Sequence, residues 1–158
     1  MDRTDFLQSL GTVEIPILST PFKVDDHFQA GREIAFGIKI AEMDLCFRRL
    51  FGGQEIAPCR ATKLRHSSLI GDTPAETLFY ILGGETKVEV SLWAIWCLMI
   101  KDSATLTGCG KPNIFHCPAV DGRVHPVGVY ESTSGWNLSG VDELVGYWLK
   151  SSRVFEPA

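Results

Sequence analysis

Four residues that could bind a metal ion or carry thiol chemistry lie within residues 109–126, "CGKPNIFHCPAVDGRVHP". Cys109, Cys117, His116 and His125 are two of the five cysteines and two of the four histidines of the chain. Structural zinc sites usually contain cysteine pairs at Cys-x2-Cys spacing, and this stretch has none. This stretch has three possible interpretations: a metal site, part of a thiol active site, or a plain β-hairpin. The missing pair favours the hairpin.

The dipeptide Asp121-Gly122 is typical of a two-residue hairpin turn. That turn would pair Pro118 with His125 and His116 with Val127. Side chains alternate across a strand, so His116 and His125 would share one face while Cys117 points to the other. One ion could not readily take both His116 and Cys117. His116 and His125 therefore remain weak metal candidates, Cys117 is expected in the core, and the histidines are expected at the margin of the sheet.

Cys97 is the thiol whose sequence neighbours predict the most regular structure around it, because it lies in the apolar run "LWAIWCLMI". Ser91 could cap a helix over residues 92–106 that stops at Gly108, although a long buried strand fits a continuous apolar run equally well. On a helix, Trp93 and Lys101 lie one turn from Cys97. A thiol reacts as the thiolate, which Lys101 would favour and the apolar neighbours would oppose.

Cys97 is therefore the candidate catalytic residue and, with His116 and His125, a weak metal candidate. A ligand pocket around it would be lined by Trp93, Trp96, Cys97, Lys101 and Cys117. No cofactor is expected.

The order of Trp96-Cys97, His116-Cys117, Asp121-Gly122 and an alternating apolar strand resembles the core of the organomercurial (alkylmercury) lyase family over about residues 77–130. The resemblance implies that Cys97 matches the first catalytic cysteine, which takes the mercury. It also implies that Cys117 matches a structural cysteine.

The chain departs from that family at two positions of the catalytic set. The family has an aspartate three residues after the first cysteine, where this chain has Ile100. Its second catalytic cysteine lies downstream of the hairpin, where no cysteine follows Cys117. Carbon–mercury cleavage needs two thiolates and an acid to protonate the leaving carbon. The resemblance therefore implies a shared fold and metal binding at Cys97. It does not extend to the full set of residues that the lyase reaction needs.

The elements expected to position these residues begin with a long amphipathic helix over residues 29–51, which Gly52-Gly53 would end. Its apolar seam at spacings of four and three could form a homodimer interface or pack into the core; the seam consists of Phe36, Ile40, Met43, Phe47 and Leu50. A short edge strand is expected around Val13 to Ile17. A helical turn after Thr73 should lead into a hairpin, "LFYIL-GGET-KVEV", and a last helix should cover residues 141–150.

The bulk composition bounds the class of protein. With 158 residues and 45% hydrophobic content, the chain should form a single domain with its own core. The net charge of −4 argues against a nucleic-acid-binding protein. No apolar run is long enough to cross a membrane, and the first residues lack the order of a signal peptide. We therefore expect a cytoplasmic protein with reduced cysteines.

The sequence predicts an α+β fold, with a mostly antiparallel sheet and hairpins packed on a buried central helix, plus the long amphipathic helix. The favoured function is binding of a thiophilic metal or a small apolar ligand around Cys97. The alternative is a non-catalytic homo-oligomeric interaction module that dimerises through the helix around residues 36–50. An enzyme using His116 and His125 as acid and base ranks last, because no partner stands at a recognisable spacing.

Overall fold

An eight-stranded mixed sheet forms the body of the protein. The computed structural model describes residues 1–35, 37–108 and 110–158. Strands β12 and β8, and strands β10 and β4, run parallel to one another, and the other neighbours are antiparallel. In order across the sheet the strands are β1 (Leu7–Ile15), β6 (Thr62–Leu69), β12 (Arg153–Pro157), β8 (Asn113–Pro118), β9 (Val124–Ser132), β10 (Gly135–Gly140), β4 (Ile38–Met43) and β3 (Arg32–Ala35). The predicted α+β class with a mostly antiparallel sheet is confirmed.

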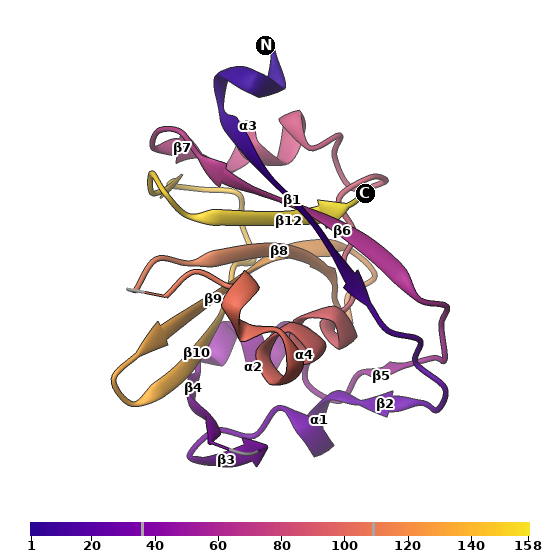
Figure 1. Cartoon of the computed structure of the whole chain (residues 1–158). Helices are drawn as coiled ribbons and strands as arrows, with labels where there is room; N and C mark the ends of the chain where they lie inside the picture. Colours follow the sequence, from indigo (N-terminus) through magenta and orange to yellow (C-terminus); the bar gives the residue numbers. More distant parts are fainter. Residues whose placement is uncertain (36, 109) are drawn as a thin grey trace.

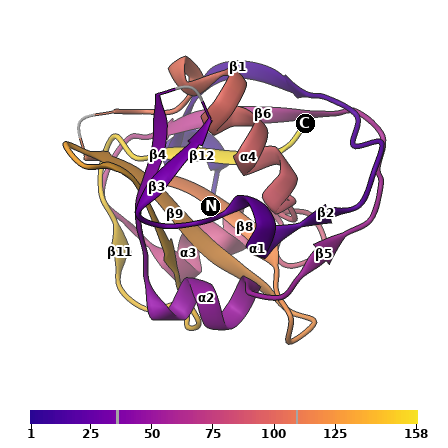
Figure 2. The same ribbon diagram turned by 90° about the horizontal axis from the view of Figure 1, so that it is seen from below.

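The remaining elements are short and surround this sheet. Two small ribbons pair β2 (Phe22–Lys23) with β5 (Glu55–Ile56) and β7 (Thr73–Pro74) with β11 (Tyr147–Trp148). The helices are α1 (Val24–His27), α2 (Leu45–Phe51), α3 (Ala75–Ile81) and α4 (Leu92–Lys101), with 3-10 turns η1 (Arg3–Asp5) and η2 (Ser103–Thr105). The sheet curls so that α4 lies on its concave side, with α1 below it and α2 behind it (Figure 1). Viewed from below, α3 lies beyond the β8–β9 strands from α4 (Figure 2).

Helix α4 decides the question left open for residues 92–106. The Ser91 hydroxyl accepts a hydrogen bond from the Ala94 N–H at 3.4 Å and caps the helix start. Ile95 and Met99 are fully buried, which accounts for the apolar run. The helix ends at Lys101 rather than near residue 106, because the chain leaves helical geometry at Asp102 and turns into η2.

Apolar side chains form one large and one small core cluster. The large cluster joins α4, α1 and α2 to the concave face of the sheet. The small cluster joins α3 to the opposite face and consists of Leu7, Leu69, Leu78, Leu82, Val88, Ile114 and Val154. The sheet is therefore buried on two faces, but far less side-chain volume covers the α3 side.

A β-bulge lets strand β1 contribute to both clusters. Ser9 pairs with Ser67 and Gly11 with His66, so Leu10 is an extra residue on this edge strand. One inserted residue reverses which face each later side chain points to. Leu7 accordingly joins the small cluster, whereas Val13 and Ile15 join the large one. Gly11 adopts φ +126°, a conformation that favours glycine at this bulge.

The predicted helix over residues 29–51 is wrong for most of its length. Residues 32–35 and 38–43 are strands β3 and β4, and only α2 is helical. Gly31 and Gly37 have φ of +84° and +70°, which break a helix and suit the turns beside β3. Phe36 lies outside the described residues. The other apolar seam residues lie in or against the large core, including fully buried Ile40, so the helical dimer seam does not exist as proposed.

Two further helix and hairpin predictions are also wrong. Helix α3 continues to Ile81 and ends before Gly83-Gly84, so "LFYIL" is not a hairpin strand. Thr73 lies in β7 and does not cap α3. Residues 141–150 form β11 and irregular chain, because the Gly146 carbonyl accepts from the Ala75 N–H at 3.0 Å and anchors this segment beside β7.

Among the described residues, no helix combines the length and the apolar composition needed to cross a bilayer.

Asp44 joins α2 to the sheet, which generates a stability prediction. Its carboxylate accepts from the Phe47 N–H at 2.7 Å, the Ser139 hydroxyl at 2.6 Å and the Gly140 N–H at 3.1 Å. We expect Asp44→Ala to lower the free energy of unfolding by about 2–3 kcal/mol, because a helix cap and two charge-assisted hydrogen bonds are lost.

The matched control is Asp142→Ala. Asp142 forms an exposed ion pair with Arg49 on the same helix, and such pairs contribute under about 1 kcal/mol. Urea unfolding of both variants is the measurement. Equal losses in the two variants would contradict the role assigned to Asp44.

Candidate functional site

The β8–β9 hairpin forms, but its register differs by one residue from the prediction. Cys117 pairs with His125 and His116 pairs with Pro126. The turn is longer than the two-residue turn expected for Asp121-Gly122, because the Ala119 N–H donates to the Arg123 carbonyl at 2.8 Å. Directly opposite residues share a face, so Cys117 and His125 point to the α4 side while His116 points to the α3 side. The prediction that the two histidines share a face is therefore wrong.

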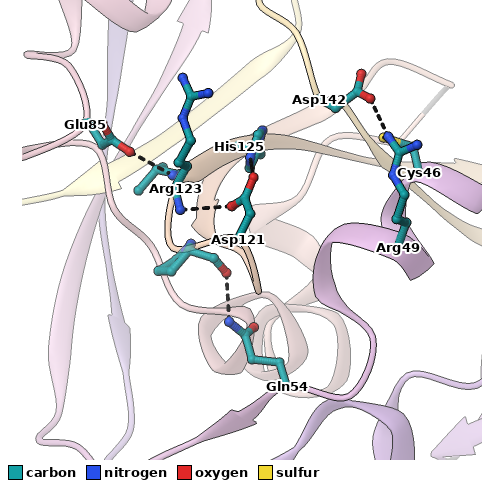
Figure 3. Close-up of polar contacts among 10 residues, drawn as sticks. Cys46, Arg49, Gln54, Glu85, Asp121, Arg123, His125 and Asp142 are labelled. Atoms are coloured by element: carbon teal, nitrogen blue, oxygen red, sulfur yellow. Dashed lines mark hydrogen bonds and ion pairs between the residues drawn. The ribbon is translucent and has the colours of Figure 1, made fainter.

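His125 serves to close the hairpin. Its Nε2 atom lies 2.7 Å from the Asp121 Oδ2 atom, and the Asp121 Oδ1 atom accepts from the Arg123 N–H (Figure 3). The Gln54 side chain also donates to the Pro118 carbonyl at 3.0 Å. These bonds lower the pKa of the Asp121 carboxyl, which accepts from the Arg123 N–H and the His125 ring. Asp121 and His125 thus act as a turn clamp.

His116 lies in an apolar setting on the other face. Its ring is fully buried and packs against Phe79 of α3, with ring centroids 5.5 Å apart. Within the described part of the chain, neither of its ring nitrogens has a hydrogen-bond partner. Burial lowers the pKa of His116 to about 4, so the ring is neutral at pH 7. His116 and His125 cannot share an ion, since the sheet separates them.

Cys97 lies on α4 and belongs to the large core cluster. Its side chain is 4% exposed, and burial raises the pKa of its thiol to about 11. Lys101, one turn later, opposes this shift. The predicted proximity of Lys101 is confirmed, but desolvation outweighs it, so Cys97 is a protonated thiol at neutral pH rather than an activated nucleophile.

A second thiol, Cys59, belongs to a segment that packs against the same core as Cys97. A negative charge on Cys59 would raise the pKa of the Cys97 thiol further. The Cys59 and Leu18 backbones exchange two hydrogen bonds, of 3.0 and 3.1 Å, and Leu18 packs in the same core cluster as Cys97. Cys59 itself is exposed. Sequence reasoning missed Cys59, because its only link to this region is the long-range pairing with Leu18 among the described residues.

The two tryptophans beside Cys97 pack against other aromatic rings. The Trp93 indole N–H donates to the Pro16 carbonyl at 3.0 Å, and its ring meets Phe22 edge-on with centroids 5.4 Å apart. Trp96 meets the rings of His27 and Phe28 with centroids 5.1 and 5.5 Å apart. Both indoles therefore help to fix α4 against α1 and the β1–β2 connection.

The described cysteines other than Cys97 and Cys59 have different surroundings. Cys117 is fully buried in the sheet, and burial together with the nearby Glu89 carboxylate raises the pKa of its thiol. Cys46 is half-buried on α2 beside Arg49 and Asp142 (Figure 3). Cys109 lies outside the described residues. The charged groups that act on the Cys97 thiol are therefore Lys101 and Cys59, whereas the one that acts on the Cys117 thiol is Glu89.

The described chain offers neither a three-ligand metal site nor a pocket around Cys97 among those formed at its surface. Within residues 1–35, 37–108 and 110–158, no three side chains of His, Cys, Asp or Glu are arranged to hold one ion. Several surface pockets are formed by described residues, and three of them surround helix α3 and its C-terminal end. Cys97, Trp93 and Trp96 line neither these three nor two further pockets near α1 and near β9.

Comparisons with protein-family models, curated proteins and solved structures found no match for this chain. The resemblance to organomercurial lyases stays a prediction.

The burial of the thiols predicts how fast each reacts with an alkylating agent. We expect iodoacetamide at pH 8 to modify Cys59 first and Cys97 at least about a hundredfold more slowly, because a thiol with a pKa of about 11 is almost wholly protonated. The rate at Cys97 should rise about tenfold per pH unit from pH 8 to pH 10. Peptide mass spectrometry after timed quenching measures both rates. Modification of Cys97 as fast as Cys59 at pH 8 would contradict this description.

Proposed function

We propose that this chain binds a soft, thiophilic metal ion between the sulfur atoms of Cys97 and Cys59. The observation that carries the proposal is the backbone pairing of the exposed Cys59 with Leu18, a residue that packs in the same core cluster as the buried Cys97. The Cys59 charge also contributes to the raised pKa of the Cys97 thiol. Thiolate sulfur is a soft ligand that favours ions such as Cu(I) and mercury over calcium or magnesium.

The number of ligands narrows the class of ion. The described residues hold no third His, Cys, Asp or Glu that could complete a site with this pair. Zinc sites normally use four ligands, or three and a water molecule. Ions that accept two sulfur ligands in a linear arrangement, such as Cu(I) and Hg(II), fit a pair of thiols better than zinc does.

The charges around the pair also favour a soft cation. Two thiolates carry two negative charges, and the Lys101 ammonium is close enough to Cys97 to lower its pKa. A monovalent ion between the thiolates would leave one negative charge for Lys101 to balance, and a divalent ion would leave none. Binding releases the thiol protons to water, so the apparent affinity should weaken as the pH falls.

The residues support binding rather than carbon–metal cleavage. In the organomercurial lyases that this sequence resembles, an aspartate follows the first cysteine by three residues, and Ile100 stands at that position here. Asp102 lies beyond the end of α4. Protonation of a leaving carbon needs an acid placed beside the metal, and this chain supplies no acid on the Cys97 face of α4.

The test is native mass spectrometry of the reduced protein with one equivalent of Hg(II) or Cu(I), in competition with a small dithiol. We expect one ion per chain in the wild type. Cys97→Ser and Cys59→Ser should each lower the apparent affinity by at least about tenfold, because each removes one of two ligands. Cys46→Ser is the matched control, since Cys46 is a half-buried thiol on a different helix, α2.

Uptake that survives Cys59→Ser unchanged would refute the two-thiol site. Uptake that falls equally in Cys46→Ser would show a non-specific thiol effect and would also count against the proposal.

A further inference from the structure

Helix α3 is held to the sheet by a small apolar cluster with a histidine inside it. Leu78 of α3 is fully buried against the sheet, together with Ile114 and Val154. His116 lies on β8 two residues after Ile114, on the same face, and Phe79 of α3 packs against its ring. Within the described chain, both nitrogens of this buried ring are without hydrogen-bond partners. The cluster therefore holds a group that can gain a charge.

The charged groups on the elements packed against His116 give it no counter-ion. On α3 the ionisable side chains, Glu76 and Tyr80, are exposed. The backbone of Glu89 bridges to His116, but its carboxylate is exposed and acts on Cys117. The Glu156 carboxylate is buried on the neighbouring strand β12, two residues after Val154, which pairs with Ile114. It is already paired with the guanidinium groups of Arg3 and Arg65. Burial is the cause of the lowered pKa of His116.

We propose that α3 is an acid-released flap, and that protonation of His116 detaches the helix from the sheet and exposes the apolar surface beneath it. A charged imidazole enclosed by apolar side chains has neither water nor a partner, so its protonated form favours the conformation in which α3 has moved away. Releasing α3 lets water reach the ring.

The chain around α3 allows such a movement. Gly83 and Gly84 follow the helix with φ of +101° and +72°, and glycine tolerates large changes of backbone angle. Before the helix, the two-residue β7–β11 ribbon is the regular pairing that holds the segment. Helix α3 has seven residues, whereas α4 has ten and is enclosed by the large cluster. Release of α3 therefore leaves the main core intact.

The pH dependence follows from the two states of His116. Its pKa is about 4 when α3 is closed and returns toward the ordinary value of 6.5 when the ring is solvated. The closed state thus keeps its full stability above pH 6.5 and loses it progressively as the pH falls toward 4. Between pH 7 and pH 5 the fraction of released α3 should rise about twentyfold.

Hydrogen–deuterium exchange at pH 7 and pH 5, corrected for the chemical exchange rate, tests the proposal on the full chain. We expect amides of α3 to exchange about twentyfold faster at pH 5 while amides of α4 keep their protection. His116→Phe should abolish this acceleration, because the ring no longer titrates. His116→Leu is a second apolar variant in case phenylalanine does not fit. His125→Asn is the control, since it removes a histidine of the same hairpin that lies on the other face.

A twentyfold acceleration retained in both apolar variants would overturn the proposal. Equal acceleration of α3 and α4 in the wild type would overturn it as well, since that result describes unfolding of the whole chain.

Discussion

The fold depends on enclosing α4, a helix that presents apolar side chains on nearly every side. Such a helix is stable in water only when it is surrounded, and one flat sheet covers a single side. The sheet therefore curls around α4, while α1, α2 and the β2–β5 ribbon close the remaining sides (Figure 1). The bulge at Leu10 serves the same need, because it turns Val13 and Ile15 toward the helix while Leu7 stays with the α3 cluster.

Enclosure of α4 also sets the chemistry available to the cysteines. Cys97 lies on a buried helix, so its thiol is protonated at neutral pH despite the adjacent Lys101. Such a thiol is a poor nucleophile but can still be a ligand. The strong bond between a soft ion and sulfur offsets the free-energy cost of removing the thiol proton. In the proposed site, the exposed Cys59 would be the first sulfur to meet an ion from solvent. This combination favours capture of an ion over turnover.

Local signals in the sequence predicted the parts of the fold that depend on local chemistry. The Ser91 cap indicated a helix at α4, although the apolar run fitted a buried strand equally well, and Asp121-Gly122 predicted a hairpin. Predictions failed where distant contacts decide the structure. The hairpin register differs because the Val120 N–H donates to the Leu50 carbonyl of α2 at 2.8 Å and lengthens the turn. The expected helix over residues 29–51 gives way to β4 pairing with β10, which no local periodicity reveals. Cys59 has no signal in its own neighbourhood, since Leu18 positions it.

X-ray absorption spectroscopy of the metal-loaded protein tests the central claim most directly, because it counts the atoms bonded to the ion. For one equivalent of Hg(II) or Cu(I), a site built from Cys97 and Cys59 predicts two sulfur ligands in the wild type and a single protein sulfur in Cys59→Ser. A spectrum with nitrogen ligands, or one that is identical in the wild type and in Cys59→Ser, would contradict the two-thiol site.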